Sequence, residues 1–316
     1  MNIVFMGSAE FGIPALEKLY TGKHKIVGIV SVPARQKGRG LKPVDSPIVN
    51  YARKKILGNL GSLKVPILLP ENLKSEEFIG ALKKLEADIF IVVAFRILPE
   101  SVFKIPPLGT VNIHASLLPK YRGPAPIQRA IEAGEKETGI TIFRIDKGID
   151  TGNVILKRSL SIEDEETSPQ LSDRLAHLGA DSLMEALSAL ENGTAMLSEQ
   201  DASQAIGAPK LSKAEGKINW NRPAGELFNM VRAFKPFPGA YAFLEKNRLN
   251  IEWALPFDAS GNDVPGVICS IGADNFDVQC LNGLLRIVEV KPEGKKSMSA
   301  KAFMLGRKIS AGMRFE

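Results

Sequence analysis

The sequence predicts an α/β fold, with a mostly parallel sheet that carries helices on both faces, followed by a small all-β domain. Over the first 190 residues, short apolar runs alternate with segments of helical periodicity, the pattern of repeated βαβ units. Beyond residue 234, short strand-like runs follow one another between turn residues, a pattern typical of a small β-barrel or sandwich. We therefore expect two domains of different architecture.

The first region contains six strand-like runs and five helix-like segments. The predicted strands are Ile3–Met6, Ile26–Val32, Asp88–Ala94, Thr110–His114, Gly139–Ile145 and Val154–Leu160. The predicted helices are Glu10–Tyr20, Pro47–Lys55, Ser75–Leu85, Pro126–Ala133 and Ser168–Glu191. The run "ADIFIVVAF" is apolar nearly throughout, as expected of a central parallel strand covered on both faces.

The second region begins after a stretch without sustained periodicity. Residues 201–221 are rich in Gly, Pro, Ser and Lys, which predicts a linker. A helix is expected at Ala224–Phe234, and the strand-like pieces are 239–245, 249–255, 266–271, 276–281 and 284–290. The expected organisation is a first domain at 1–200, a linker at 201–221 and a second domain at 222–316.

The composition is that of a globular protein with a core, since 44% of residues are hydrophobic and 24% are charged. The two cysteines, Cys269 and Cys280, lack metal-ligand spacing, and their scarcity suits a reducing compartment. No apolar run approaches the roughly 20 residues of a membrane helix, and the start of the chain does not have the pattern of a signal peptide. We therefore predict a cytoplasmic protein with no membrane association. The three histidines are spread along the chain, so no metal site is predicted.

Positive charge is concentrated toward the C-terminus. Residues 210–316 hold 16 Lys and Arg against 11 Asp and Glu, which leaves only +1 of the net charge of +6 for residues 1–209. This asymmetry favours a polyanionic partner that is contacted by the C-terminal third.

A long connection at residues 33–47, "PARQKGRGLKPVDSP", is also basic. Arg35, Lys37, Arg39 and Lys42 lie in it with no acid among them. Such a loop is either a solvated surface loop or a segment that grips phosphates, and the basic C-terminal third favours the second interpretation.

The stretch "GSAEFG" at Gly7–Gly12 follows the first predicted strand and suggests a nucleotide-binding turn. Ile13 and Pro14 stand where a phosphate-binding loop has Lys and Ser or Thr, and Ala9 breaks the G-x-G-x-x-G pattern. A plain strand-to-helix turn is therefore the better interpretation.

Asn112 and His114 stand two residues apart at the end of a predicted strand, in "VNIHASLLPKYRG". Residues at this spacing point to the same face, and the carboxyl end of a parallel strand is where open α/β sheets bind ligands. The alternative is that both side chains are satisfied by neighbouring backbone. Function is favoured, because two polar groups converge at that edge.

The stretch "RIDKGIDTGNVI" places Asp146 and Asp150 in a glycine-punctuated loop between two predicted strands. Both aspartates are possible turn formers. A carboxylate from this loop that reaches His114 would complete a set of amide, imidazole and carboxylate. Such a set suits acyl transfer to an amine, because one member polarises a carbonyl and the other two move protons.

The segments "NIHASLLPKYRGPAPIQRAI" and "DKGIDTG" resemble the formyltransferases that use 10-formyltetrahydrofolate. The likeness runs nearly end to end, from "FMGSAEFGIPALEKL" through "GRG" to "KLSKAEGKINWNRPA", "VRAFKPFPGAY" and "GKKSMSA". The last three motifs are similar to the tRNA-directed branch of that family. The resemblance implies a Rossmann-like first domain, an OB-like barrel, 10-formyltetrahydrofolate as formyl donor without a metal, and initiator methionyl-tRNA as acceptor.

Position by position, the resemblance implies roles for three groups of residues. The catalytic residues are Asn112, His114 and Asp150. The folate-binding residues are Ser116, Leu117, Leu118 and Pro119, with Phe95, Arg96 and Ile97 of "AFRILP", a segment that lacks the usual glycine and is one residue short. The tRNA-binding residues are Arg35, Lys37, Arg39, Lys42, Lys210, Lys213, Lys295 and Lys296. We expect a monomer.

Three rival interpretations remain. One is a formyl-folate enzyme acting on a small amine, such as a nucleotide sugar or glycinamide ribonucleotide, and another is a hydrolase of the same cofactor. Neither has an evident use for the basic C-terminal domain and the "GRG" loop. The third is a non-catalytic RNA-binding protein, which would explain the charge but not the combination of Asn112, His114 and Asp150.

Overall fold

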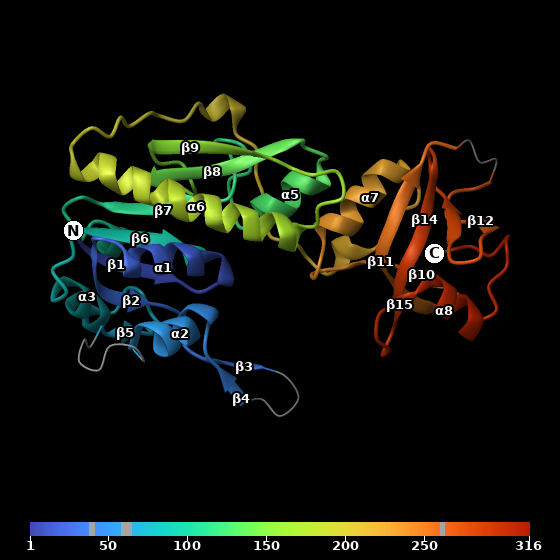
Figure 1. Cartoon of the computed structure of the whole chain (residues 1–316), viewed down its shortest axis with the longest axis horizontal. Coiled ribbons are helices and arrows are strands. Elements are labelled where there is room, and N and C mark those ends of the chain that lie inside the picture. The colour runs from blue at the N-terminus through green and yellow to red at the C-terminus, as the bar shows by residue number, and fades with distance from the viewer. Residues whose placement is uncertain (38–41, 58–64, 260–262) are drawn as a thin grey trace. The chain divides into compact units, whose positions relative to one another are not determined.

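The computed structural model describes residues 1–37, 42–57, 65–259 and 263–316, and they form two compact units. The first unit comprises Met1–Gly123, Glu137–Ser161 and Ser172–Ala208. The second unit comprises Pro124–Lys136, Ile162–Leu171 and Pro209–Glu316. Figure 1 shows the helices and strands of both units.

The first unit is built on a seven-stranded sheet in the order β5-β2-β1-β6-β7-β8-β9. Its strands are β1 (Asn2–Gly7), β2 (Lys25–Val30), β5 (Ile67–Leu68), β6 (Ile89–Val93), β7 (Thr110–His114), β8 (Glu137–Arg144) and β9 (Val154–Ser161). Neighbours from β5 to β7 are parallel, whereas β8 is antiparallel to both β7 and β9. The predicted mostly parallel sheet is confirmed.

Helices cover both faces of this sheet. On one face, Val4, Phe90 and Val92 pack against α3 (Glu76–Lys83) and α4 (Glu100–Phe103). On the other face, Phe5 and Val93 lie against the start of α1 (Ile13–Thr21) and α2 (Pro47–Tyr51). The long helix α6 (Ser168–Glu191) approaches the same face closely at Gly179, where an added Cβ would lie 2.9 Å from the Ile113 side chain.

The basic connection at residues 33–47 is more ordered than a loop. Strand β3 (Arg35–Lys37) pairs antiparallel with β4 (Lys42–Val44), and Arg35 lies opposite Val44. The predicted Arg39 lies in 38–41, outside the described residues, and the side chain of Lys37 is likewise not described. The sequence did not predict this hairpin because three-residue strands are too short to show alternation.

Several other elements differ from expectation for local reasons. The first predicted helix opens with a 3-10 turn at Glu10–Gly12, and α1 follows with a proline in its first turn. Helix α2 continues as a π-helix at Ala52–Leu57. Strand β5 and helix α4 were not predicted, because two and four residues carry no readable periodicity.

The second unit contains an antiparallel six-stranded sheet in the order β10-β11-β14-β13-β12, with β15 paired to β14. The strands are β10 (Ala240–Leu244), β11 (Asn247–Phe257), β12 (Ile268–Ile271), β13 (Phe276–Gln279), β14 (Leu284–Pro292) and β15 (Met298–Ser299). The C-terminal residues bridge both edge strands: Glu316 exchanges backbone hydrogen bonds with Phe243 of β10, and Ile268 N of β12 donates to Met313 O. This pairing joins the two edges, as in a barrel.

Helices of the second unit pack on one another and on this sheet. Helix α5 (Pro126–Glu132) contacts α7 (Ala224–Ala233), while α8 (Ala300–Gly306) packs on β14. The ring of Phe228 on α7 meets Trp253 of β11 edge-on, with 5.8 Å between ring centroids. Across the described residues, no helix is both long and apolar enough to cross a membrane.

The predicted linker contains ordered backbone. Short 3-10 turns occur at Ala202–Gln204 and Ala214–Gly216, and Ile218 N donates to Tyr241 O at 2.7 Å. Residues 201–208 belong to the first unit, and 209–221 belong to the second. The division into 1–200, 201–221 and 222–316 stays a prediction.

Candidate active site

Asn112 and His114 lie at the carboxyl end of β7, the strand whose bounds the sequence predicted. In the parallel register, Asn112 lies opposite Val92 of β6, and the alternation of side chains places Asn112 and His114 on one face. Asp150 comes from the connection between β8 and β9, two strands that follow β7 in the sheet. Two separate parts of the sequence, β7 and the β8–β9 connection, therefore contribute to this site.

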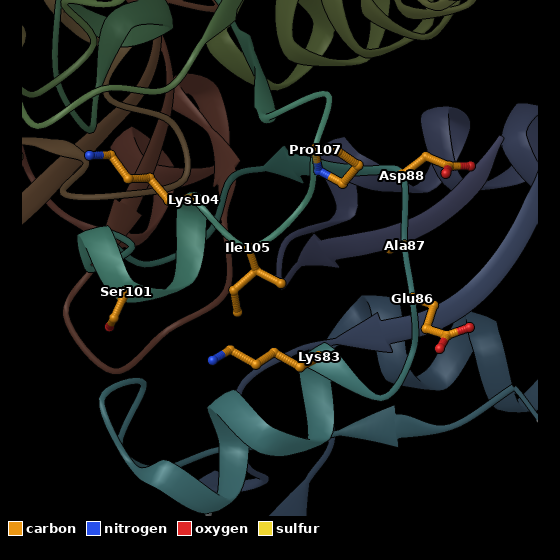
Figure 2. A pocket seen from close by; sticks show the side chains of 8 residues that line it. All are labelled: Lys83, Glu86, Ala87, Asp88, Ser101, Lys104, Ile105 and Pro107. Atoms are coloured by element: carbon orange, nitrogen blue, oxygen red, sulfur yellow. The ribbon is translucent and has the colours of Figure 1, made fainter.

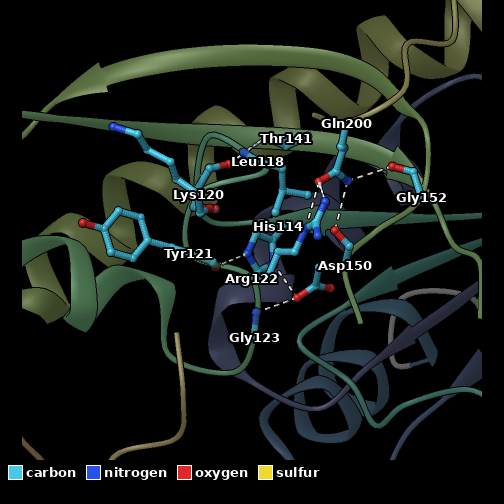
Figure 3. A network of polar contacts seen from close by, with 11 residues as sticks. His114, Leu118, Lys120, Tyr121, Arg122, Gly123, Thr141, Asp150, Gly152 and Gln200 are labelled. Carbon is cyan, nitrogen blue, oxygen red and sulfur yellow. Dashed lines mark hydrogen bonds and ion pairs between the residues drawn. The ribbon is translucent and has the colours of Figure 1, made fainter. Parts of the chain in front are cut away.

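His114 is buried, and both of its ring nitrogens have neighbours. Nε2 lies 2.9 Å from the backbone oxygen of Tyr121, and Nδ1 lies 3.6 Å from Oδ2 of Asp150 (Figure 3). A carbonyl oxygen can only accept, so the Nε2 atom carries the proton and donates it to Tyr121. The Nδ1 atom consequently faces the carboxylate.

Asp150 is held by the backbone of a neighbouring turn. Gly123 N donates to Oδ2 of Asp150 at 2.8 Å, and Asp150 itself has the left-handed φ of 54°. Gly123 has a φ of 122°, and an added Cβ there would lie 2.7 Å from Ala208 O. Only glycine fits this position, which explains why Gly123 follows Tyr121 and Arg122 in the sequence.

The Asn112 amide is available to a ligand. Its side chain is half-buried, and within the described part of the chain it makes no hydrogen bond. Because an unpaired amide costs about 1–3 kcal/mol when it is buried, a half-open amide at a strand end suits a bound acceptor better than a packing role.

The Ser116–Pro119 segment forms a turn fixed by polar contacts. Ser116 Oγ donates to Lys120 O at 2.6 Å, and Thr141 Oγ1 donates to Ser116 O at 2.7 Å. Leu118 N donates to Thr141 Oγ1 at 3.0 Å, and the Leu118–Pro119 peptide is cis. Thr141 therefore ties the turn to β8. The expected folate-binding role of residues 116–119 stays a prediction.

The segment Phe95–Ile97 follows the carboxyl end of β6, next to β7. Arg96 donates to Pro70 O at 2.6 Å and to Glu71 O at 3.0 Å, so its guanidinium anchors a neighbouring loop. Burial, and next the charge of Arg35, lowers the pKa of Arg96 from its ordinary value. Ile97 is 79% exposed. The expected contacts of this segment with folate stay a prediction.

The described cations of the expected tRNA surface are exposed, and none pairs with an acid among the described residues. In the first unit they are Arg35 and Lys42. In the second unit they are Lys210, Lys213, Lys295 and Lys296. Unpaired surface cations are free to contact phosphates.

Sequence reasoning missed two side chains of the site, those of Gln200 and Arg122. Gln200 accepts from Arg122 Nε at 3.1 Å and from a terminal guanidinium nitrogen at 2.7 Å, and it donates to Asp150 O and Gly152 O at 2.9 and 2.8 Å. Figure 3 shows this side chain between the Arg122 and Asp150 segments. Gln200 is 50 residues from Asp150 in the sequence, and no motif or periodicity linked them.

A pocket lies elsewhere in the first unit. Figure 2 shows its lining, which includes Lys83, Asp88, Lys104 and Pro107. These residues precede β6 and β7 or belong to the neighbouring helices, so the pocket opens at the amino ends of the strands, opposite the Asn112 end. In the described part of the chain, no group of three or more His, Cys, Asp or Glu could hold a metal.

Comparisons with known proteins identify the family. Residues 1–187 match the family described as "Formyl transferase", and residues 210–308 match "Formyl transferase, C-terminal domain". The chain is 40% identical over 314 residues to the methionyl-tRNA formyltransferase of Caldanaerobacter subterraneus subsp. tengcongensis, covering 99% of both chains. It is 42% identical to the methionyl-tRNA formyltransferase of Thermodesulfovibrio yellowstonii, covering 99% of this chain and 98% of the relative.

Solved structures with low sequence identity share the fold. The methionyl-tRNA formyltransferase from Clostridium thermocellum has a TM-score of 0.53 at 17% identity, over 90% of this chain and 100% of that one. HypX from Aquifex aeolicus in complex with tetrahydrofolic acid has a TM-score of 0.64 at 16% identity, over 98% of this chain and 50% of that one. This chain belongs to the formyl transferase family and is a formyltransferase.

Proposed function

We propose that this enzyme transfers the formyl group of 10-formyltetrahydrofolate to the α-amine of initiator methionyl-tRNA. The observation that carries this proposal is the meeting of His114 and Asp150 at the carboxyl end of β7, with the Asn112 amide on the same face of that strand. Relatives that match nearly the whole chain are methionyl-tRNA formyltransferases, which supports the choice of acceptor.

The residues present fit a folate formyl donor. The donor supplies an electrophilic formyl carbon and a nitrogen, N10, that leaves with a proton. The half-open Asn112 amide offers a hydrogen-bond donor to a carbonyl oxygen, and His114 and Asp150 offer proton acceptors beside it. We assign the ordered turn at Ser116–Pro119 and the segment Phe95–Ile97 to the folate, because both follow neighbouring strands at this edge.

Asn112 donates to the formyl oxygen, where negative charge gathers as the amine adds. One donor of this kind is worth about 2.7–4 kcal/mol of the barrier. The Nε2 proton of His114 is given to Tyr121 O, so this atom is not a second donor to the formyl oxygen. We therefore assign His114 to proton transfer with Asp150.

His114 and Asp150 receive the proton that the attacking amine sheds and return it to N10 as the carbon–N10 bond breaks. The acceptor is the Nδ1 atom together with the carboxylate that faces it at 3.6 Å. General acid–base catalysis of this type typically accelerates a reaction by about 10²–10⁴-fold. A carbon–nitrogen bond forms, another breaks, and the proton count balances.

The tRNA is held by cations from both units, each unit contacting its own part of the nucleic acid. Arg35 and Lys42 of the β3–β4 hairpin, with Lys37 and Arg39 of the same connection, contact phosphates near the reacting amine. The placement of Arg35 is supported by its charge, which contributes to the lowered pKa of Arg96, a residue that follows β6 at the site edge. Lys210, Lys213, Lys295 and Lys296 of the second unit contact other phosphates. We assign residues 1–200 to catalysis, 201–221 to a linker and 222–316 to tRNA binding, in a cytoplasmic monomer.

A direct assay tests this function. Purified enzyme is incubated with 10-formyltetrahydrofolate and either methionyl-tRNA, an amino sugar nucleotide or glycinamide ribonucleotide, and the formylated product is measured. We expect product with methionyl-tRNA only, because the small amines carry far fewer phosphates than a tRNA and cannot engage the many exposed lysines. Product with a small amine but not with methionyl-tRNA would replace the proposed acceptor. Hydrolysis of the donor at the same rate without any amine would indicate a hydrolase.

A further inference from the structure

The Gln200 side chain connects the two backbone segments on which the proposed catalytic pair depends. Its amide nitrogen donates to Asp150 O at 2.9 Å and to Gly152 O at 2.8 Å, so one NH₂ group clamps the Asp150 turn. Its amide oxygen accepts two hydrogen bonds from Arg122, at 3.1 and 2.7 Å. Figure 3 shows all four contacts, which use both ends of a single half-buried amide.

The segment held through Arg122 contacts both members of the pair. Tyr121 O accepts from His114 Nε2, and Gly123 N donates to Oδ2 of Asp150. Arg122 lies between these two residues, so a shift of its backbone displaces the partners of His114 and Asp150 together. Gln200 therefore fixes the Asp150 turn on one side and the 121–123 segment on the other.

The residues after Gln200 reinforce the same segment by backbone pairing. Arg122 N donates to Ile206 O at 2.8 Å, and Ala208 N donates to Arg122 O at 2.6 Å. Ile206 N donates to Pro119 O at 3.3 Å. Residues 200–208, which we call the strap, thus pair in parallel with the chain that leads from Pro119 to Gly123.

We propose that Gln200 is a positioning residue for formyl transfer, which holds the carboxylate of Asp150 and the imidazole of His114 in register. This inference rests on the proposed function, because it assumes that Asp150 and His114 handle the protons of that reaction. Gln200 acts through these residues and is not assigned a contact with either substrate. Misplacement of reacting groups by about 1 Å typically costs about 10²-fold in rate, so a single supporting amide is enough to matter.

The kinetic test compares Gln200→Leu with Gln204→Leu. Both residues lie in the strap, but the Gln204 amide is exposed and its one described side-chain contact is with Asp201, at 3.0 Å. We expect Gln200→Leu to lower kcat by about 10–100-fold with KM for both substrates within threefold, since alignment changes but binding groups remain. Gln204→Leu should match the wild type. A Gln200→Leu enzyme with wild-type kcat, or with a loss confined to KM, would overturn the proposal.

A second variant separates the two ends of the amide. Gln200→Glu keeps an acceptor for Arg122 but cannot donate to Asp150 O and Gly152 O. If the clamp on the Asp150 turn positions the carboxylate, kcat of Gln200→Glu falls as far as that of Gln200→Leu. Wild-type kcat in Gln200→Glu would overturn the clamp.

A third measurement needs no activity. The chain has three histidines, so selectively labelled protein gives three sets of ring resonances. We expect Gln200→Leu to shift the His114 ring signals at fixed pH and to leave those of His24 and His177 in place. Unmoved His114 signals would overturn the inference even if methionyl-tRNA is formylated. Moved signals in a protein that formylates no methionyl-tRNA would support the positioning of His114 while the proposed function fails.

Discussion

Asp150 in the first unit and Asp277 in the second unit are both largely buried carboxylates, and they differ in how completely they are satisfied. Asp277 is 5% exposed and accepts from Arg286 at 2.8 and 3.0 Å and from Ser270 at 2.8 Å. Asp150 accepts from Gly123 N at 2.8 Å and faces His114 across 3.6 Å, with 17% of its side chain exposed. Since a carboxylate can accept about four hydrogen bonds, Asp150 can still accept hydrogen bonds from a ligand, whereas most of the acceptor positions of Asp277 are already used.

The difference shows how a polar residue of the fold is told from a polar residue of a site. Arg286 and Ser270 reach Asp277 from β14 and β12, the strands on either side of β13, so these bonds hold the second sheet together. Around Asp150 the donors come from turns, and the neighbouring Asn112 amide stays unpaired among the described residues. A buried polar side chain whose hydrogen bonds are all made within the fold indicates a role in stability. Unused hydrogen-bond donors and acceptors at a strand end indicate a role in binding or catalysis.

The largest expected effect is on turnover, from Asn112→Ala. Removal of the proposed oxygen donor should lower kcat by about 10²–10³-fold, and the melting temperature should change little because no described partner is lost. The matched control is Asn250→Ala in β11 of the second unit, also half-buried, where the amide oxygen accepts from Arg248 at 3.1 Å. Steady-state kinetics and thermal unfolding measure both variants. Equal kcat in the two variants would show that Asn112 takes no part in the mechanism. It would also contradict the view that unpaired polar groups mark the site in the first unit.

The next effect is on stability, from Asp277→Asn. Burial raises the pKa of the Asp277 carboxyl, but hydrogen bonds from Arg286 and Ser270 outweigh it, so the pKa lies below its ordinary value. The ionised form is thus favoured in the folded state. Its contribution is fully present above the unfolded pKa of about 3.9 and is lost as pH falls through that value toward the lower folded pKa. At neutral pH, Asp277→Asn should lower the free energy of unfolding by about 1–2 kcal/mol.

Tryptophan fluorescence isolates this effect, because the chain has two tryptophans and both, Trp220 and Trp253, belong to the second unit. Urea titrations followed by this signal should show wild type and Asp277→Asn converging below about pH 4, with kcat per folded enzyme unchanged. Parallel curves at all pH values would mean that Asp277 does not titrate in this range. A large loss of kcat would place Asp277 in the site.

The smallest expected effect distinguishes the cations of the two units. Arg35→Ala/Lys42→Ala in the first unit and Lys295→Ala/Lys296→Ala in the second should each raise KM for tRNA and leave kcat near wild type. Two lost phosphate contacts should flatten the slope of log KM against log salt concentration by about 1.5. Lys83→Ala/Lys84→Ala, which removes two exposed lysines at the amino edge of the first sheet, is the control. If a double variant has the same salt dependence of KM as the wild type, its two cations do not contact phosphates and serve only the solubility of the protein.

Local patterns in the sequence were enough to predict the strands that position the site. Strand β7 begins and ends where predicted, because an apolar run between a glycine and a Ser-Leu-Leu-Pro turn has clear limits. The shared direction of Asn112 and His114 follows from the two-residue period of a strand. The resemblance then pointed to Asp150, which the structure places beside His114.

Contacts between distant segments are absent from any local pattern, and these had to come from the folded chain. The Gln200 amide meets Asp150 across 50 residues, and Gln200 is the last residue before the stretch whose composition predicted a linker. The C-terminal Glu316 pairs with Phe243 at the edge of the second sheet, although the last residues show no strand periodicity. Periodicity reports which face of an element is apolar, but it does not specify which segments meet. That choice depends on packing and hydrogen bonding across the whole unit, so the framework could be predicted while the partners that hold His114 and Asp150 could not.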